Sequence, residues 1–301
     1  MSKVRINIPA STTNLGPGFD VLGMALKLYN TIEMERSTSG LNIEVEGEGE
    51  KILSRDETNL VYQSSKAIFD KIGGKIPPLN IKLINSIPLA RGLGSSGTAI
   101  IGGLMGANAI SGAGLSYEDI LNIAADIDGH PDNVAASIFG GLVIASSTEN
   151  GIAYMKIIPP RTLSVVAVVP DFHLFTTDAR AILPASVDLK TAVFNISRSS
   201  LLVAAMATGD FRHLGISMED RLHQPYRAML IPGIDDVFKA AKNENAAVAI
   251  SGAGSSIVAF CHSDNGREVG EKMRQAFLKH NVNSYVMMLD IDEKGTELQY
   301  E

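Results

Sequence analysis

The chain reads Pro88-Leu89-Ala90-Arg91-Gly92-Leu93-Gly94-Ser95-Ser96-Gly97-Thr98 between two segments of contrasting pattern. Upstream, residues 79–84 alternate polar and apolar side chains, as a half-buried strand does. Downstream, residues 98–110 form an apolar run of helical length. The first N–H groups of a helix lack intrahelical acceptors and lie at the positive end of the helix dipole, so they attract anions. The stretch therefore predicts a phosphate-binding loop between a strand and a helix.

Glycines and serines give this loop its chemistry. Gly92, Gly94 and Gly97 permit a positive φ and remove the Cβ that would keep a ligand away. Ser95 and Ser96 add hydroxyls that can cap the helix or reach a phosphate oxygen or its metal ion. The spacing matches neither the Walker loop nor the dinucleotide fingerprint. Two interpretations stay open: a triphosphate cradle, and a tight turn whose glycines serve packing alone.

Composition indicates an ordinary globular protein. The 301 residues are 45% hydrophobic and 20% charged, and a net charge of −7 argues against nucleic acid or an anionic membrane as a partner. One cysteine, Cys261, excludes an intramolecular disulfide and a zinc cage of several thiolates. The amino terminus has a strand pattern and no signal-peptide block, and no apolar run reaches the roughly 18 residues of a membrane span. These features predict a cytoplasmic protein.

Strand and helix patterns follow one another irregularly, which predicts an α+β fold rather than a regular βαβ series. Strands are predicted at residues 4–8, 30–36, 41–46, 79–84, 140–145, 154–158, 163–169, 248–251, 256–260 and 285–289. Helices are predicted at residues 58–72, 98–110, 115–126, 191–208, 234–243 and 266–279. Pro159 and Pro160 interrupt the chain, so we place a domain boundary there, giving domains 1–158 and 159–301.

Two further segments combine turn-forming residues with hydrogen-bonding side chains. Residues 9–20 follow the first predicted strand, and residues 251–256 separate two later strands. Each also fits a simpler interpretation: an irregular connection that satisfies its own backbone in the first case, and a hairpin in the second. If both converge on the glycine loop, the three together would surround a polyanion.

In order, and over essentially the whole chain, the three segments resemble the three motifs of the GHMP kinase superfamily, which includes galactokinases, mevalonate kinases and phosphomevalonate kinases. Within it, the chain is most similar to the homoserine kinase branch. That similarity rests on four stretches: Asn14-Leu15-Gly16-Pro17-Gly18-Phe19-Asp20, Gly129-His130-Pro131-Asp132-Asn133, Thr176 to Pro184, and His223-Gln224-Pro225-Tyr226-Arg227. The resemblance implies an amino-terminal domain like ribosomal protein S5 domain 2 and a ferredoxin-like carboxy-terminal domain.

The resemblance also implies the reaction: phosphorylation of the side-chain hydroxyl of L-homoserine by ATP with Mg²⁺, giving O-phospho-L-homoserine and ADP on the route to threonine. The loop from Pro88 to Thr98 would wrap the triphosphate, with Thr176 near the phosphates. The amino-acid pocket would be formed by Asn14, Asp20, His130, Asp132, Asn133, Arg180 and Arg227. The forks of Arg180 and Arg227 suit the substrate carboxylate, and Asp20 suits its ammonium group. Without the motifs, each arginine would be interpreted as a surface ion pair.

Two assignments within this resemblance concern catalysis. Other branches carry aspartate near the position of Asn133, yet phosphoryl transfer depends chiefly on positioning and charge neutralisation. We therefore predict that Asn133 orients the hydroxyl without accepting its proton. The family implies that a loop serine, here Ser96, and an upstream glutamate bind Mg²⁺. The chain departs from this pattern, so we predict Asp128 as the second ligand, with Asp126 as the alternative.

Two other functions remain as alternatives. A kinase for a sugar, a mevalonate-type acid or an isoprenoid precursor would share the fold, but the paired arginines and the amide, imidazole and carboxylate groups argue against a sugar. A catalytically silent nucleotide sensor would keep the loop without turnover, although the sequence shows no added interaction domain. A homodimer is implied by the resemblance alone.

Overall fold

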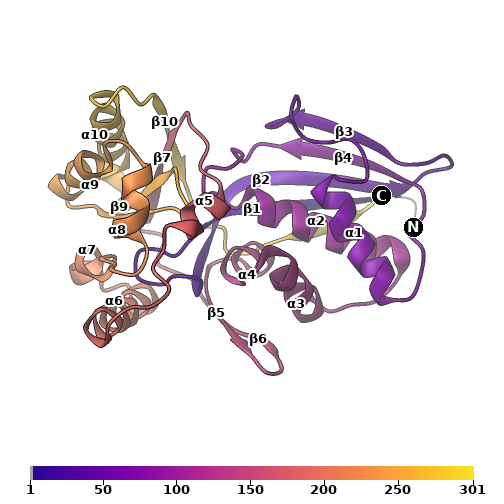
Figure 1. Cartoon of the computed structure of the whole chain (residues 1–301), viewed down its shortest axis with the longest axis horizontal. Helices are drawn as coiled ribbons and strands as arrows, with labels where there is room; N and C mark the ends of the chain where they lie inside the picture. The colour runs from indigo at the N-terminus through magenta and orange to yellow at the C-terminus, as the bar shows by residue number, and fades with distance from the viewer. Residues whose placement is uncertain (1–2) are drawn as a thin grey trace.

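The computed structural model describes residues 3–301 and divides their strands between two sheets (Figure 1). A seven-stranded sheet with helices α1 to α4 occupies one half of the molecule, and a four-stranded sheet with the later helices occupies the other. The prediction of a two-part α+β fold is confirmed. No helix in this described part of the chain is long and apolar enough to cross a membrane.

The larger sheet is ordered β11-β1-β2-β4-β3, and β5 pairs with both β2 and β6. Its strands are β1 (Lys3–Thr13), β2 (Leu22–Arg36), β3 (Asn42–Gly47), β4 (Leu79–Asn85), β5 (Leu142–Thr148), β6 (Gly151–Ile157) and β11 (Glu297–Tyr300). Among the described residues, β3 and β4 run parallel, and the other neighbouring strands of this sheet pair antiparallel. The helices that cover it are α1 (Leu60–Lys71), α2 (Ser95–Ser111), α3 (Tyr117–Asp128) and α4 (Asp132–Phe139).

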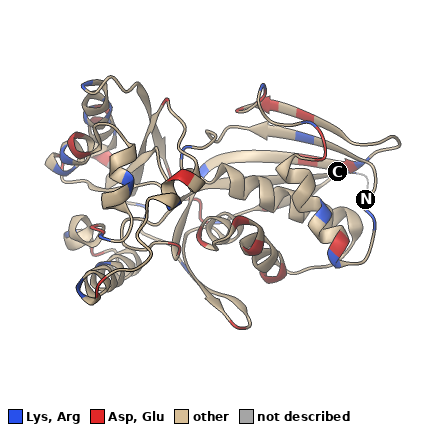
Figure 2. Cartoon of the chain, viewed as in Figure 1, with Lys and Arg blue, Asp and Glu red and all other residues tan. Residues whose placement is uncertain are grey.

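Helix α2 is the central element of this half. It carries no charged side chain, as Figure 2 shows, and it is buried between the sheet and α1. Two of its glycines allow this close packing: a Cβ at Gly102 would collide with Ile32 of β2, and one at Gly103 with the Val61 carbonyl of α1. Elsewhere in the same view, charges of both signs are spread over the outer helices and strand ends.

The smaller sheet is antiparallel throughout and is ordered β10-β7-β9-β8, the order of a ferredoxin-like fold. Its strands are β7 (Leu163–Pro170), β8 (Ala247–Ile250), β9 (Ile257–His262) and β10 (Ser284–Leu289). The helices of this half are α5 (Thr176–Ala181), α6 (Leu189–Thr208), α7 (Leu214–Ser217), α8 (Gln224–Arg227), α9 (Ile234–Asn243) and α10 (Gly266–Leu278). Short 3-10 turns complete it: η1 (Phe211–His213), η2 (Ala228–Leu230) and η3 (Ser263–Asn265).

Strand β7 packs on both faces. Val166 and Val168 face the cluster under α9 and α10, whereas Val165 and Ala167 face a second cluster that includes α6. That second cluster also contains Leu22 and other residues of β2, so apolar contacts join the two sheets where the halves meet. These apolar contacts hold the two halves of the molecule together where they meet.

Local differences from the sequence predictions have identifiable causes. The segment predicted as a connection from Pro9 begins as strand, because β1 stays paired with β2 as far as Thr13, with a register shift between Pro9 and Ala10. Helix α2 begins at Ser95 rather than Thr98, and its N-cap is Gly94 without a side-chain cap bond. Helices α4, α5, α7 and α8 have eight residues or fewer, too short for a clear periodic pattern.

The chain's last strand returns to its first. Strand β11 pairs with β1, and the Glu301 amide donates to the Lys3 carbonyl at 3.1 Å. Between the two sheets, β6 ends at Ile157 and β7 begins at Leu163. The domain boundary between residues 158 and 159 stays a prediction.

Candidate active site

The three turn-rich segments meet at the junction of the two sheets. Ser251 Oγ donates to the Gly92 carbonyl at 2.6 Å, and the Ser256 amide donates to the Arg91 carbonyl at 3.2 Å. The Gly252 amide donates to the Thr13 carbonyl at 3.2 Å, which connects the third segment to the end of β1. Residues 251–256 thus close the β8–β9 hairpin and also contact the other two segments.

A cavity of about 910 Å³ opens beside these segments. Every residue from Pro88 to Gly97 lines it, together with the cluster Asp128, His130 and Asn133 and, from the facing half, Thr176 and Arg180. Thr98 does not line the cavity. It is buried, donates to the Ser95 carbonyl at 2.8 Å and accepts a hydrogen bond from Asn30.

Two loop glycines are required by their surroundings. Gly92 and Gly94 have φ of +75° and +76°, and a Cβ would collide with the Ser251 carbonyl at the first position and with Ser11 Oγ at the second. Gly97 lies inside α2, where a Cβ would make ordinary contacts, at 3.5 Å from Asn133 Cβ. The first helical bond of α2 runs from the Thr98 amide to the Gly94 carbonyl, so the amides of residues 95–97 precede it. The helix therefore presents donors to the cavity.

Acidic groups and a histidine lie opposite this helix start. Burial raises the pKa of Asp128 to about 6. His130 Nδ1 lies 3.3 Å from Asp128 Oδ2 but hydrogen-bonds to Asp132 Oδ1 at 3.0 Å. Although burial opposes the change, the hydrogen bond and charge of Asp132 raise the pKa of His130. Among residues 3–301, no group hydrogen-bonds to Asp128 Oδ2, so a residue that lines the cavity keeps a buried carboxylate oxygen without a hydrogen bond.

The two aspartates considered as metal ligands lie differently. Asp128 lines the cavity and its side chain is 10% exposed, whereas Asp126 is exposed and does not line it. Ser96 also lines the cavity from the first turn of α2. Across the described residues, no cluster of three or more His, Cys, Asp or Glu is arranged to hold a metal ion by itself. Mg²⁺ held by one carboxylate, one hydroxyl and phosphate oxygens needs no such cluster.

Asn133 is oriented by a residue that the sequence reasoning did not single out. Ser11 Oγ donates to Asn133 Oδ1 at 2.9 Å, and Ser11 is buried in β1. With Oδ1 engaged, the Nδ2 amino group remains as the donor of this side chain. Ser11 lies within the segment that the sequence highlights, but only the fold brings it to Asn133, 122 positions further along the chain.

Arg180, which lines the cavity, forms a two-point ion pair with Asp20, which does not line it; the N–O distances are 2.7 and 3.0 Å. The Arg180 guanidinium carbon lies 5.4 Å from the centre of the Phe19 ring, and that of Arg227 lies 5.2 Å from the same ring. The fold therefore brings both arginines to one aromatic side chain, although they are far apart in sequence. Phe19 lies within the quoted motif, but its role as their common neighbour is a structural finding.

Arg227 is almost fully buried, at 1% exposure. It donates to the Gly252 carbonyl at 2.9 Å and to the Ala179 carbonyl at 3.3 Å. Burial lowers its pKa to about 10, so it stays charged at neutral pH. Within residues 3–301 it forms no ion pair with a carboxylate. A buried cation held only by neutral groups is suited to an anionic ligand.

The predicted pocket residues Asn14 and Asp132 hold neighbouring residues of the site in place. Asn14 has a positive φ of 67°, donates to the Gly252 carbonyl and accepts from the Asp20 amide. Asp132 is 2% exposed and accepts from His130 and from the Asn133 amide. Neither lines the cavity directly, but both hold residues that do.

Two family models match the chain: the GHMP kinase N-terminal domain at residues 59–141 and the GHMP kinase C-terminal domain at residues 202–279. The chain belongs to the GHMP kinase family. Homoserine kinase of Moorella thermoacetica is 46% identical over 94% of this chain and 96% of its own length. Homoserine kinase of Carboxydothermus hydrogenoformans is 42% identical over 97% and 95%. The crystal structure of homoserine kinase from Cytophaga hutchinsonii is 30% identical, with a TM-score of 0.89 over 99% of this chain and 98% of that one.

Proposed function

We propose that this GHMP kinase is a homoserine kinase, which transfers the terminal phosphoryl group of ATP to the side-chain hydroxyl of L-homoserine. The products are ADP and O-phospho-L-homoserine, the latter serving threonine biosynthesis. The observation that carries the proposal is that two arginines meet at Phe19 beside the cavity that the glycine loop lines. Arg180 lines this cavity, and Arg227 is buried next to Phe19 without lining it. Relatives named homoserine kinase match this chain over nearly its full length.

Homoserine is a zwitterion, and the ion pair between Asp20 and Arg180 fits both of its charges. Asp20 would bind the ammonium group, while Arg180 and Arg227 would bind the carboxylate. Without substrate, Asp20 and Arg180 bind each other. An amino acid that enters the site would therefore replace the ion pair between Asp20 and Arg180 with two ion pairs of its own, one to each residue. The buried Arg227 would also gain an anionic partner.

The loop supports binding of the triphosphate. The donors at the start of α2, with the backbone of residues 88–97, line the cavity where the phosphates would lie. Thr176, at the start of α5, lines the same cavity, so its hydroxyl can contact a phosphate oxygen. Thr98 would act indirectly, by fixing the first turn of the helix.

Ser96 and Asp128 fit a magnesium ion, because a hydroxyl and a buried carboxylate oxygen that accepts no hydrogen bond are both hard oxygen ligands at the phosphate site. When bound, Mg²⁺ neutralises charge on the phosphates. Asn133 would donate from Nδ2 to the substrate hydroxyl or the transferring phosphoryl group, which aligns the two reacting groups. Because an amide has no basic site for the hydroxyl proton, that proton would pass to the phosphoryl oxygens rather than to Asn133.

A panel of alcohols tests the function directly. Purified protein with ATP and Mg²⁺ should release ADP rapidly with L-homoserine and slowly with L-serine, L-threonine, mevalonate and galactose. Preference for another alcohol would instead support a different kinase of the family. ATP binding without turnover of any alcohol would support the nucleotide sensor.

We also propose a cytoplasmic location, to which the single buried thiol of Cys261 is suited. A homodimer stays a prediction.

A further inference from the structure

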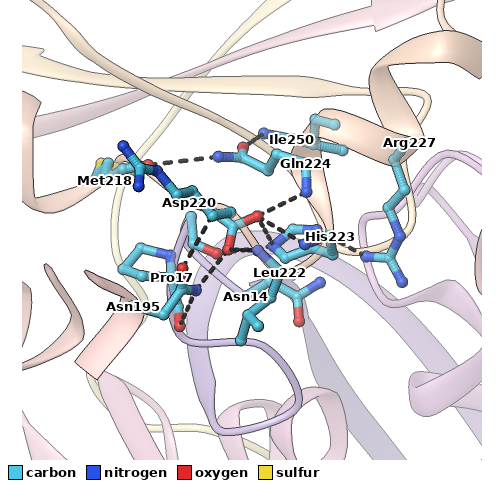
Figure 3. Close-up of polar contacts among 12 residues, drawn as sticks. Asn14, Pro17, Asn195, Met218, Asp220, Leu222, His223, Gln224, Arg227 and Ile250 are labelled. Atoms are coloured by element: carbon cyan, nitrogen blue, oxygen red, sulfur yellow. Dashed lines mark hydrogen bonds and ion pairs between the residues drawn. The ribbon is translucent and has the colours of Figure 1, made fainter. Parts of the chain in front are cut away.

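Behind the cavity wall, a buried polar cluster connects α6, α8 and the loop that follows β1 (Figure 3). Asp220 lies at the centre of this cluster, and its side chain is fully buried. The carboxylate accepts from the backbone amides of Leu222, His223 and Gln224 at 2.8, 2.9 and 2.6 Å, and from Asn195 Nδ2 at 2.6 Å. Asp220 therefore holds the start of α8, and with it the position of the His223 ring.

The neighbours of His223 determine its tautomer. Nε2 lies 2.7 Å from the Gly16 carbonyl, which can only accept, so Nε2 carries a proton. Nδ1 lies 3.2 Å from Arg227 Nη1, which can only donate, so Nδ1 offers its lone pair. The ring is therefore neutral. Burial lowers the pKa of His223, which favours the same state, although the Asp220 carboxylate lies 3.5 Å away and Asp20 is nearby.

The ring thereby joins two parts of the proposed substrate pocket. Gly16 belongs to the loop that carries Asp20, and Arg227 provides a cation for the carboxylate. Phe19 stacks on His223 with ring centres 5.2 Å apart and an interplanar angle of 26°. The Arg227 guanidinium is thus held by an imidazole nitrogen and two carbonyl oxygens, with Phe19 beside it.

We propose that His223 is a positioning residue for substrate recognition: its neutral imidazole fixes the Arg227 guanidinium against the loop that carries Asp20, and so sets the site for the amino-acid carboxylate. The role rests on the proposed function, since it concerns how homoserine is held. His223 does not itself touch the substrate or the nucleotide.

Three substitutions separate this role from simple packing. His223→Leu fills a similar volume but provides no acceptor for Arg227. His223→Asn places an amide oxygen near the position of Nδ1 while losing the contact with Gly16. His213→Leu is a matched control, because His213 is exposed in the same half of the molecule.

In steady-state assays of the full-length enzyme, His223→Leu should raise the KM for homoserine about tenfold or more, the size expected for one lost hydrogen bond to a charged group. The KM for ATP should stay within about twofold of the wild-type value. In the control variant His213→Leu, the KM values for homoserine and for ATP should both stay within about twofold of the wild-type values. His223→Asn should recover a substantial part of the affinity for homoserine. An unchanged KM for homoserine in His223→Leu would overturn the proposal. So would an equal rise in both KM values, loss of folding in both His223 variants, or a His223→Asn enzyme no better than His223→Leu.

A measurement without turnover keeps this test separate from that of the function. In ¹⁵N NMR of the unliganded protein at neutral pH, His223 should carry its proton on Nε2, and the Arg227 guanidinium should give a rigid signal that His223→Leu averages. If the wild-type protein does not phosphorylate homoserine, the proposed function fails, and these spectra still decide whether His223 holds Arg227. A doubly protonated ring, or an Arg227 signal insensitive to His223→Leu, would refute the positioning role.

Discussion

Asp128→Asn should stabilise the protein while impairing catalysis. Burial removes water from the charged carboxylate of Asp128 and so destabilises the folded state, and a neutral asparagine avoids this cost. Burial raises the pKa of Asp128 from 3.8 to about 6. Since the folded state favours the protonated form, the stabilisation is complete below about pH 4 and is lost as the pH rises through about 6. A shift of about two pKa units corresponds to roughly 3 kcal/mol, and this figure bounds the gain expected from asparagine.

Urea unfolding in the presence of EDTA measures this gain. At pH 8, the free energy of unfolding of Asp128→Asn should exceed that of the wild type by about 1 to 3 kcal/mol, and the two should converge near pH 4. Asp126→Asn is the matched control, because Asp126 is exposed and does not line the cavity, and it should change neither stability nor Mg²⁺ dependence.

The same variant tests the ligand role. With ATP and homoserine saturating, Asp128→Asn should lower kcat by about 100-fold and raise the Mg²⁺ concentration needed for half-maximal activity. A variant no more stable than the wild type at pH 8, or a stability difference independent of pH, would refute the electrostatic reasoning. Unchanged Mg²⁺ dependence would refute Asp128 as a ligand and leave the stability result standing.

Four other substitutions have defined outcomes. Gly92→Ala should lower the free energy of unfolding by about 3 kcal/mol, because the residue has a positive φ and the added methyl group would collide with a backbone carbonyl. Gly97→Ala should not destabilise the protein, because a Cβ there makes ordinary contacts. Equal effects of the two substitutions in urea titrations would contradict this geometry. Asn133→Ala should lower kcat about 10- to 100-fold with little change in the KM for ATP, and full turnover would exclude its orienting role. Arg180→Met should raise the KM for homoserine at least about tenfold without changing nucleotide affinity measured by calorimetry, and an unaffected KM would remove Arg180 from the pocket.

Local patterns predict the elements that carry the nucleotide site. The strand at residues 79–84 is visible from its alternation of polar and apolar residues, and the helix after Thr98 from the length of its apolar run; both are found, as β4 and α2. The start of α2 is displaced to Ser95 because Gly94, held at positive φ beside Ser11, provides the cap. That contact crosses the chain, so no local pattern contains it.

The limit of prediction from local sequence is clearer for the residues proposed to bind the amino acid. The motifs single out Arg180 and Arg227, but nothing in their local sequence distinguishes a half-exposed ion pair from a buried cation. The helices that carry them have six and four residues, too few for a periodic signal. Asn195 lies in a helix with no functional motif around it, and its contact with Asp220 arises only when α6 packs against α7 and the turn that precedes α8. An aspartate three residues before His223 is a visible pattern for a local turn, yet the tautomer of the ring depends on distant Gly16.

A crystal structure with homoserine, Mg²⁺ and an unreactive ATP analogue tests the central claim most directly. We expect the triphosphate on the amides of residues 92–97, the amino-acid carboxylate between Arg180 and Arg227, and the substrate hydroxyl beside Asn133 and in line with the terminal phosphate. Nucleotide bound away from this loop, or homoserine bound with its carboxylate away from both arginines, would contradict the account.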